Sequence, residues 1–292
     1  MKILVIGSNG QLGQSIKKIL SAAKINEEDE FIFIGREDLD LTNEESISAY
    51  LNENIIEIIV NCAAYTAVDK AESEEELAYQ INHLAIRKIA EISNKKKVKI
   101  IHISTDYIFD GVSENAYLES DEPNPINIYG KTKLAGEVAV CEAMQKNAII
   151  IRTSWLYSEY SNNFVDTILR KGRKFDEFSV VSDQFSSPTN ASDLAKVIMQ
   201  IINHKKFRKH DQITQIYHYS SYGVCSWFEF AREILELANI DCQVNPIETK
   251  DYLTDAKRPK YSVLNTDKIV DGFGLEIPFW KDSLKASIDN LL

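Results

Sequence analysis

The chain has 292 residues, 44% of them hydrophobic, which is enough to bury the core of one large domain or two modest ones. Its formal net charge of −11 argues against a nucleic-acid partner and against an anionic membrane surface. The opening apolar run "KILVI" is too short for a signal peptide and no later run approaches a membrane span, so a cytoplasmic protein is expected.

Short apolar stretches alternate with helical ones through the first half of the chain. They are rich in Ile and Val without period-two alternation, which is typical of strands buried on both faces of a parallel sheet. Two intervening helices carry the S/T-x-x-E capping box, Thr42 with Glu45 and Ser73 with Glu76. The pattern predicts a Rossmann-type doubly wound α/β sheet, whose ligands bind beyond the carboxyl ends of the strands. The predicted strands cover residues 2–6, 30–35, 55–63, 98–104 and 148–154.

The first predicted strand runs into the glycine-rich stretch "VIGSNGQLG". Gly7 allows a tight turn, Gly10 lets the backbone approach a pyrophosphate, and Gly13 permits close packing of the next helix. The N-terminus of that helix faces the phosphates. The stretch therefore predicts a dinucleotide site, and Gln11 and Leu12 are expected to belong to it.

The second predicted strand ends in "IGRED". The guanidinium of Arg36 suits a ribose 2′-phosphate, which favours NADPH over NADH. Glu37 and Asp38 stand next to it, so NADH stays open as the alternative. Asp40 and Leu41 follow and are predicted to border the cofactor.

The third predicted strand leads into "NCAAYTAVDKAE", residues 61–72. Its small side chains would let the ribose and adenine of a cofactor lie against the backbone, although packing against a neighbouring helix would demand small residues too. The predicted cofactor-binding residues here are Cys62, Ala63, Ala64 and Tyr65. The four cysteines of the chain form no C-x-x-C pair and are predicted to be buried free thiols.

Hydroxyl side chains end the fourth predicted strand, at Ser104 and Thr105, where they would face the ligand crevice. Further along, "IYGKTK" places Tyr129 four residues before Lys133. Each helical residue turns by about 100°, so Lys133 shares the face of Tyr129 and Lys131 does not. An ammonium beside a phenol stabilises the phenolate, which would make Tyr129 a proton donor at neutral pH.

The regular alternation of predicted strands and helices ends at about residue 155. Helices are predicted at 162–172, 192–204 and 226–240, and a strand at 216–221. The expected division is an NADP-binding Rossmann domain over 1–154, with late sheet elements returning from about 190–220. Residues 155–292 would form mainly a smaller substrate-binding lobe.

Eight ordered motifs resemble those of the extended short-chain dehydrogenase/reductases, and the resemblance runs from Met1 nearly to the end of the chain. More narrowly, the chain is similar to the branch that reduces the 4-keto group of a dTDP-linked 6-deoxy hexulose in making dTDP-L-rhamnose. The resemblance implies Thr105, Tyr129 and Lys133 as the catalytic triad, with Ser104 as the alternative hydroxyl. The motifs are "GSNGQLG", "NCAAYTAVDKAE", "STDYIFDG", "PNPINIYGKTKLAGE", "RTSWLY", "VSDQFSSPT", "SWFEFA" and "AKRP".

The resemblance also implies a pocket for the dTDP-linked 4-keto-6-deoxy sugar, bordered by Asp106, Tyr107 and Trp155. Arg258 and Lys260 are candidates for its diphosphate. Some relatives dimerise through a metal held by acidic residues, but the corresponding places here read Gln14, Ser15 and "NASD", so no metal is predicted.

Two other functions stay open. The same fold could act on another nucleotide-linked 4-keto sugar, or it could serve as a non-catalytic NADP-binding regulatory subunit. Intact Thr105, Tyr129 and Lys133 favour an enzyme. The expected assembly is a monomer or a homodimer.

Overall fold

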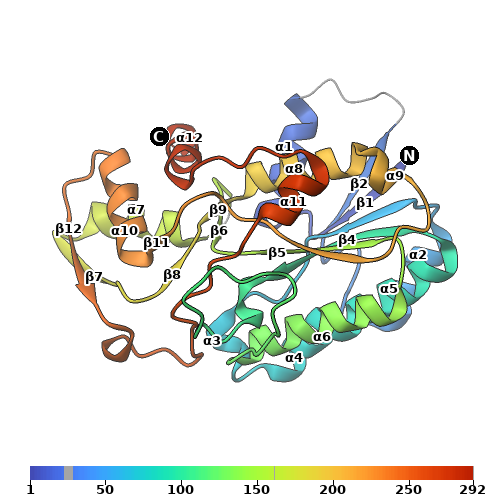
Figure 1. Cartoon of the computed structure of the whole chain (residues 1–292), viewed down its shortest axis with the longest axis horizontal. Coiled ribbons are helices and arrows are strands. Elements are labelled where there is room, and N and C mark those ends of the chain that lie inside the picture. Colours follow the sequence, from blue (N-terminus) through green and yellow to red (C-terminus); the bar gives the residue numbers. More distant parts are fainter. Residues whose placement is uncertain (23–28, 161, 292) are drawn as a thin grey trace.

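A single parallel sheet forms the centre of the computed structural model, which describes residues 1–22, 29–160 and 162–291 (Figure 1). Six strands pair in the order β10-β5-β4-β3-β1-β2, and every pairing is parallel. The predicted doubly wound sheet is therefore confirmed. The strands are β1 (Lys2–Ile6), β2 (Glu30–Ile34), β3 (Ile58–Asn61), β4 (Lys99–Thr105), β5 (Ala148–Thr153) and β10 (Gln215–His218).

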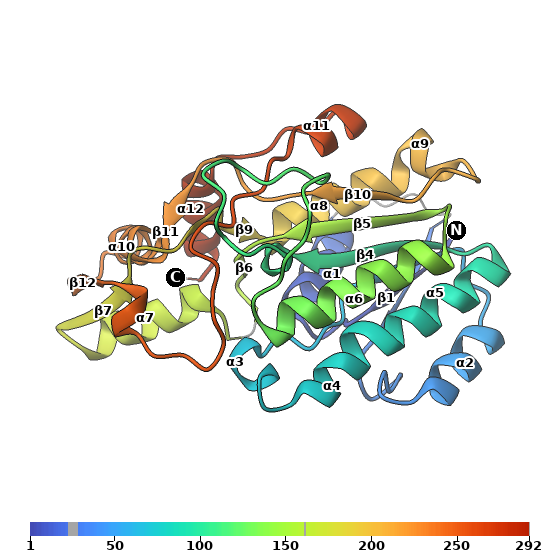
Figure 2. The same cartoon turned by 60° about the horizontal axis from the view of Figure 1, so that its bottom comes forward.

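Helices cover both faces of the sheet, as Figures 1 and 2 show. Each face has its own apolar core, because successive strand residues point to opposite faces, where each meets the helices of that face. One face carries α1 (Gln11–Ala22), α8 (Ala191–Asn203), α9 (Lys205–Arg208) and α11 (Asp267–Phe273). The other carries α2 (Glu44–Glu53), α5 (Ala85–Lys96) and α6 (Ile128–Ala143), with the short α3 (Val68–Ala71), α4 (Glu75–Tyr79), π-helical η1 (Gln80–Leu84) and η2 (Asp106–Ile108).

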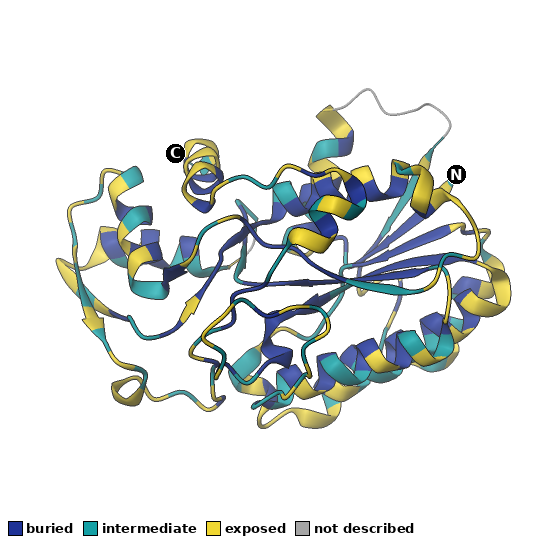
Figure 3. Ribbon diagram, viewed as in Figure 1, coloured by how far each residue is buried: buried dark blue, intermediate teal, exposed yellow. Residues whose placement is uncertain are grey.

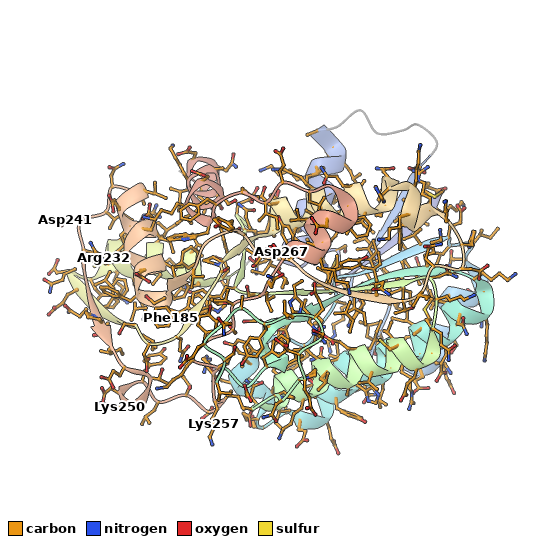
Figure 4. The ribbon with its side chains drawn as sticks, in the orientation of Figure 1. Phe185, Arg232, Asp241, Lys250, Lys257 and Asp267 are labelled. Carbon is orange, nitrogen blue, oxygen red and sulfur yellow. The ribbon has the colours of Figure 1, made fainter. Side chains whose placement is uncertain are left out.

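A second region packs beyond the carboxyl ends of the strands and has its own apolar core. Figure 4 labels Arg232 and Asp241 in it, and Lys250 and Lys257 on the segment that leads back toward the sheet. Its larger elements are α7 (Phe164–Lys174), β7 (Glu177–Val181), α10 (Trp227–Leu237), β12 (Gln243–Ile247) and α12 (Trp280–Leu291). Short pieces join the two regions: β6 (Leu156–Tyr157), β8 (Phe185–Ser186), β9 (Thr189–Asn190), β11 (Cys225–Ser226) and η3 (Thr249–Asp251).

Burial follows position in the sheet (Figure 3). All four residues of β3 and all six of β5 are buried, whereas the edge strand β2 is exposed at Glu30, partly buried over the next three residues and fully buried only at Ile34. The continuous apolar runs in the sequence thus mark strands that are covered on both faces.

Both predicted capping boxes are wrong. The N-cap of α2 is Asn43, whose side chain accepts from the backbone of Glu45 and Ser46, while Thr42 donates to Asp40 instead. Helix α4 has no side-chain cap, because the Ser73 hydroxyl donates to the Lys70 carbonyl that closes α3. A complete capping box is found at the start of α10, in Ser226 with Glu229.

The four cysteines are free thiols, as predicted, but only Cys225 is fully buried and the other three are partly exposed. Among the described residues, no helix is long and apolar enough to cross a membrane.

Candidate active site

A cleft of about 900 Å³ opens at the carboxyl ends of the sheet strands, between the sheet and the second region. Every residue predicted to be catalytic or cofactor-binding lines it except Gly13, which is packed behind the glycine-rich turn. Of the four residues predicted to bind substrate, three line it and Arg258 does not. The predicted residues in the lining are Gly7, Gly10, Gln11, Leu12, Arg36, Asp40, Leu41, Cys62, Ala63, Ala64, Tyr65, Thr105, Asp106, Tyr107, Tyr129, Lys133 and Trp155.

The glycine-rich turn brings the start of α1 to the floor of this cleft. Gly7 has a φ of +88°, and a Cβ there would lie 2.7 Å from the backbone nitrogen of Ala63. A Cβ on Gly13 would lie 2.4 Å from the Gly7 carbonyl oxygen, so any side chain would push α1 away from the turn. A Cβ on Gly10 meets only that same oxygen, at 3.4 Å. The fold therefore requires Gly7 and Gly13, and Gly10 keeps the cleft side of the turn open.

Arg36 is the exposed cation at the end of β2, where the cleft begins. The acidic side chains around it serve local turns: Asp38 accepts from the Gly35 backbone at 2.8 Å, and Asp40 accepts twice from Thr42. The hydrogen bonds from Thr42 lower the pKa of Asp40. The Arg36 guanidinium is thus available to an anionic group in the cleft.

The loop after β3 is held in place by Asn82, a buried residue of the π-helical turn η1. Its side-chain oxygen accepts from the Tyr65 backbone at 2.8 Å, and its amide donates to Thr132 of α6 at 3.1 Å. Tyr65 itself donates to Glu74, and this bond raises the pKa of the phenol to about 12. Sequence reasoning missed Asn82, because an asparagine inside a helical stretch gives no local sign of such a role.

The side chain of Gln11 fastens α1 to the segment after β5. Its amide donates to the Leu156 carbonyl at 3.3 Å, and its oxygen accepts from Ser158 at 3.0 Å. Gln11 thus joins the two walls of the cleft through its side chain.

Thr105, Tyr129 and Lys133 meet where β4 ends and α6 begins. The N-cap of α6 is Asn127, whose side chain accepts from the Gly130 backbone at 2.7 Å. A Cβ on Gly130 would lie 2.1 Å from the Tyr107 carbonyl oxygen, so this glycine lets the first turn of α6 press against η2. The rings of Tyr107 and Tyr129 then pack edge to face, with centroids 5.9 Å apart.

Lys133 is only 1% exposed, and its ammonium donates to the Ile103 carbonyl at 2.7 Å. Burial lowers the pKa of this lysine to about 8. The predicted lowering of the Tyr129 pKa by Lys133 is not found: burial raises the pKa of Tyr129 to about 12, and the Thr105 hydroxyl is the neighbour that lowers it. The Lys133 ammonium is held at the backbone of β4, so burial of the phenol decides the pKa of Tyr129.

The two candidate hydroxyls differ in their surroundings. Thr105 interacts with Tyr129, accepts from the Tyr107 backbone at 3.2 Å and donates to Asp106 at 3.1 Å. Ser104 is buried, and its hydroxyl has no hydrogen-bond partner among the described residues. The geometry favours Thr105 as the partner of Tyr129.

Asp106 is 2% exposed, and its carboxylate faces protein groups. It accepts from Thr105 and, at 2.6 Å, from Ser262. Burial raises the pKa of Asp106 to about 7 even though the hydrogen bonds lower it. Ser262 was missed, because it lies 156 residues away in the sequence.

Aromatic residues form the wall of the cleft that faces the strands. Trp155 has a φ of 45°, a left-handed backbone that a tryptophan rarely adopts. Its ring stacks on Trp227 of α10 with centroids 3.4 Å apart, and Phe164 packs against Trp227 at 4.4 Å. Trp227 and Phe164 were missed as site residues, although Trp227 stands in the motif "SWFEFA".

Arg258 does not line the cleft and is already paired. It forms two hydrogen bonds with the Asp69 carboxylate, at 3.0 and 2.7 Å. Lys260 lies 3.8 Å from Asp183. For Arg258 to bind the substrate diphosphate, the pair with Asp69 must open, so that role stays a prediction.

The described residues contain no group of three or more His, Cys, Asp or Glu side chains arranged to hold a metal ion.

Comparison with known proteins gives a consistent set of relatives. The family model described as the RmlD substrate binding domain matches residues 1–292. A dTDP-4-dehydrorhamnose reductase of Sinorhizobium fredii is 37% identical over 100% of this chain and 98% of its own length. The crystal structure of a dTDP-4-dehydrorhamnose reductase from Bacillus anthracis in complex with NADP is 39% identical, with a TM-score of 0.90 over 99% of both chains.

One similar protein carries a different name. A dTDP-4-keto-6-deoxy-D-glucose reductase of Streptomyces niveus is 33% identical over 96% of this chain and 94% of its own length.

Proposed function

The chain belongs to the RmlD substrate binding domain family of oxidoreductases, and we propose that it reduces dTDP-4-dehydrorhamnose to dTDP-L-rhamnose with NADPH in the cytoplasm. The observation that carries the proposal is the meeting of Thr105, Tyr129 and Lys133 in one cleft at the carboxyl ends of the strands. The relatives from Sinorhizobium fredii and Bacillus anthracis, named for this activity, support it across the full length of the chain.

The residues of the cleft suit NADPH. The turn at Gly7 and Gly10 leaves room for a pyrophosphate at the start of α1, and Arg36 offers a guanidinium to a 2′-phosphate. Cys62, Ala63 and Ala64 present a wall of small side chains for the ribose and adenine. Lys133, which lines the same cleft, would hold the ribose hydroxyls of the nicotinamide half.

NADPH, when bound, supplies the hydride that reduces the 4-keto carbon. Tyr129 donates its proton to the oxygen of that ketone as it becomes an alkoxide. Thr105 hydrogen-bonds the same oxygen and stabilises its developing charge. The stacked rings of Trp155 and Trp227 in the lining would shield the reacting atoms from water on that side of the cleft.

Residues 155–292 would mainly bind the substrate, because they contribute the aromatic side chains Trp155, Phe164 and Trp227 to the cleft. Tyr107 and Trp155 are the side chains proposed to border the sugar. Arg258 would meet the diphosphate after release from Asp69.

A second candidate is reduction of a different dTDP-linked 4-keto-6-deoxy sugar, which the relative from Streptomyces niveus favours. Oxidation of NADPH with a panel of dTDP-4-keto-6-deoxy sugars separates the two. We expect the highest kcat/KM with dTDP-4-dehydrorhamnose. A higher value with another sugar of the panel moves the assignment to that sugar, and binding of NADPH without any turnover means a non-catalytic protein.

The cofactor preference has its own test in Arg36→Ala. Loss of a charge-assisted contact to the 2′-phosphate should lower the preference for NADPH over NADH by about 10- to 100-fold. The matched control is Glu37→Ala, because Glu37 is exposed beside Arg36 but does not line the cleft. An unchanged preference in Arg36→Ala would refute this role of the guanidinium.

A further inference from the structure

The Thr105 hydroxyl stands at the centre of a chain of polar groups that runs away from the cleft. On one side it interacts with Tyr129. On the other it donates to one carboxylate oxygen of Asp106, at 3.1 Å, and the second oxygen accepts from Ser262 at 2.6 Å. The Tyr107 backbone donates to Thr105 at 3.2 Å, which fixes the position of the oxygen.

The number of protons shared among these hydrogen-bonded side chains limits what Thr105 can do. A hydroxyl has one proton to donate, and an ionised carboxylate can only accept. While Asp106 is ionised, the Thr105 proton is committed to it and cannot point to a ketone oxygen in the cleft. When Asp106 carries a proton on the oxygen nearest Thr105, the carboxyl becomes the donor and the Thr105 proton is released toward the cleft.

We propose that Asp106 is a positioning residue whose protonation turns the Thr105 hydroxyl from its resting partner toward the ketone oxygen of the substrate. The protonated form is the active one. Ser262 holds the carboxyl in this orientation, so a residue of the C-terminal segment takes part in setting the direction of a hydrogen bond in the cleft. This inference rests on the reductase function proposed above.

The surroundings of Asp106 place its titration near neutrality, at a pKa of about 7, because burial disfavours the carboxylate. Burial also raises the pKa values of Tyr107 and Tyr129, so both phenols are uncharged there. The charge of Arg258 lowers the pKa of Tyr107, but this guanidinium is paired with Asp69. The pKa of Lys133, about 8, lies above that of Asp106. The elements around Asp106 also carry Lys99, Lys131, Glu137 and Lys260, besides His102 and Tyr261. Burial lowers the pKa of His102, so this imidazole is neutral.

Asp106→Asn separates this role from a merely structural one. The amide keeps the shape of the carboxyl, accepts from Ser262 through its oxygen and donates to Thr105 through its nitrogen, so it imitates the protonated state at every pH. We expect wild-type kcat to fall above about pH 7, and the variant to keep its kcat until Lys133 titrates near pH 8.

Ser262→Ala tests the hydrogen bond on the other oxygen of the Asp106 carboxylate. Removal of a donor to the carboxylate should raise the Asp106 pKa, and with it the alkaline fall in kcat, by about one pH unit. Ser283→Ala is the matched control, because Ser283 also donates to a carboxylate, that of Asp193, at 2.6 Å but outside the cleft. Its pH profile should match the wild type.

A direct titration gives a readout that needs neither cofactor nor substrate. In protein labelled with ¹³C at aspartate carboxyls, NMR should show one carboxyl that titrates near pH 7, is missing in Asp106→Asn and moves upward in Ser262→Ala. The proposal is overturned by the absence of that carboxyl, by an inactive but folded Asp106→Asn, or by a pH profile that neither variant moves. Lack of turnover in the wild type with the titration intact would overturn the reductase function instead.

Discussion

Helix α6 carries two buried polar clusters one turn apart, and they are built differently. At its first turns Lys133 donates to the Ile103 backbone carbonyl, and Asp106 of η2, which packs against α6, accepts from the hydroxyls of Thr105 and Ser262. One turn further, Glu137 is held by Arg152 of β5 through three hydrogen bonds of 2.7 to 3.1 Å, and both side chains are 2% exposed. His218 lies against the other side of the guanidinium, 3.3 Å away.

The difference separates a structural cluster from one that can exchange protons. The core pair of Glu137 and Arg152 matches each buried charge with an opposite one, so removal of either partner leaves a costly charge behind. In the cleft cluster burial dominates: it lowers the pKa of Lys133 although the charge of Glu137 raises it, and it raises the pKa of Asp106, so both pKa values shift toward neutrality. Groups with such shifts are typical of catalytic sites.

The largest effect on activity is expected at Tyr129, in the cluster that lines the cleft. Tyr129→Phe removes the proposed acid and should lower kcat by about 10²- to 10⁴-fold, while NADPH affinity stays close to that of the wild type. Steady-state kinetics and a fluorescence titration with NADPH measure the two. The control is Tyr222→Phe, because Tyr222 is 70% exposed and outside the cleft. Near-normal turnover by Tyr129→Phe would exclude it as the acid.

Arg152→Met tests the other cluster, that of Glu137 and Arg152, and its effect should appear in stability rather than in kcat. It leaves Glu137 buried and unpaired, which should lower the free energy of unfolding by about 3–5 kcal/mol. Urea denaturation measures the change. Arg170→Met, which breaks the exposed pair with Asp166, should cost no more than about 0.5 kcal/mol.

The double variant Arg152→Met, Glu137→Leu should recover most of that loss, because no charge then stays buried alone. If the single variant is as stable as the wild type, the distinction between the two clusters fails.

Lys133→Met should change how the free energy of unfolding depends on pH. The lysine has a pKa of about 8 in the fold and 10.5 as its ordinary value, so the unfolded chain binds more protons between these values. The wild type therefore gains about 3 kcal/mol as the pH rises from about 8 to 10.5. The variant lacks this gain, and unfolding curves at both ends of the range reveal it. In Lys131→Met, whose lysine is exposed on the same helix, the wild-type gain should persist.

The smallest expected effect concerns Asn127, the N-cap of the helix α6 that carries both Lys133 and Glu137. Asn127→Ala removes the bonds to the Gly130 backbone and to the Lys257 carbonyl, and should lower the free energy of unfolding by about 1–2 kcal/mol. Asn43→Ala at the start of α2 removes a cap of the same kind away from the site. It should cost a similar amount without a change in kcat, whereas Asn127→Ala should lower both. Equal kcat in the two variants would show that the cap does not position Tyr129.

Local pattern was enough for the features that depend on neighbours in the sequence. The parallel sheet and the glycine-rich turn with Gly7 and Gly13 could be predicted, and so could the fact that Tyr129 and Lys133, but not Lys131, point to the same cleft. Continuous apolar runs, a tight turn before a helix and i,i+4 spacing have the same physical consequences wherever they occur.

Tertiary structure alone decided how the site residues are paired and charged. Ser262 reaches Asp106 across 156 residues and Asp69 reaches Arg258 across 189, while Trp227 at the start of α10 stacks on Trp155 in the segment after β5. The same is true of the pKa of Tyr129, which burial raises although the sequence places a lysine beside it. Burial and long-range hydrogen bonds depend on which segments the fold brings together, and no local spacing encodes them.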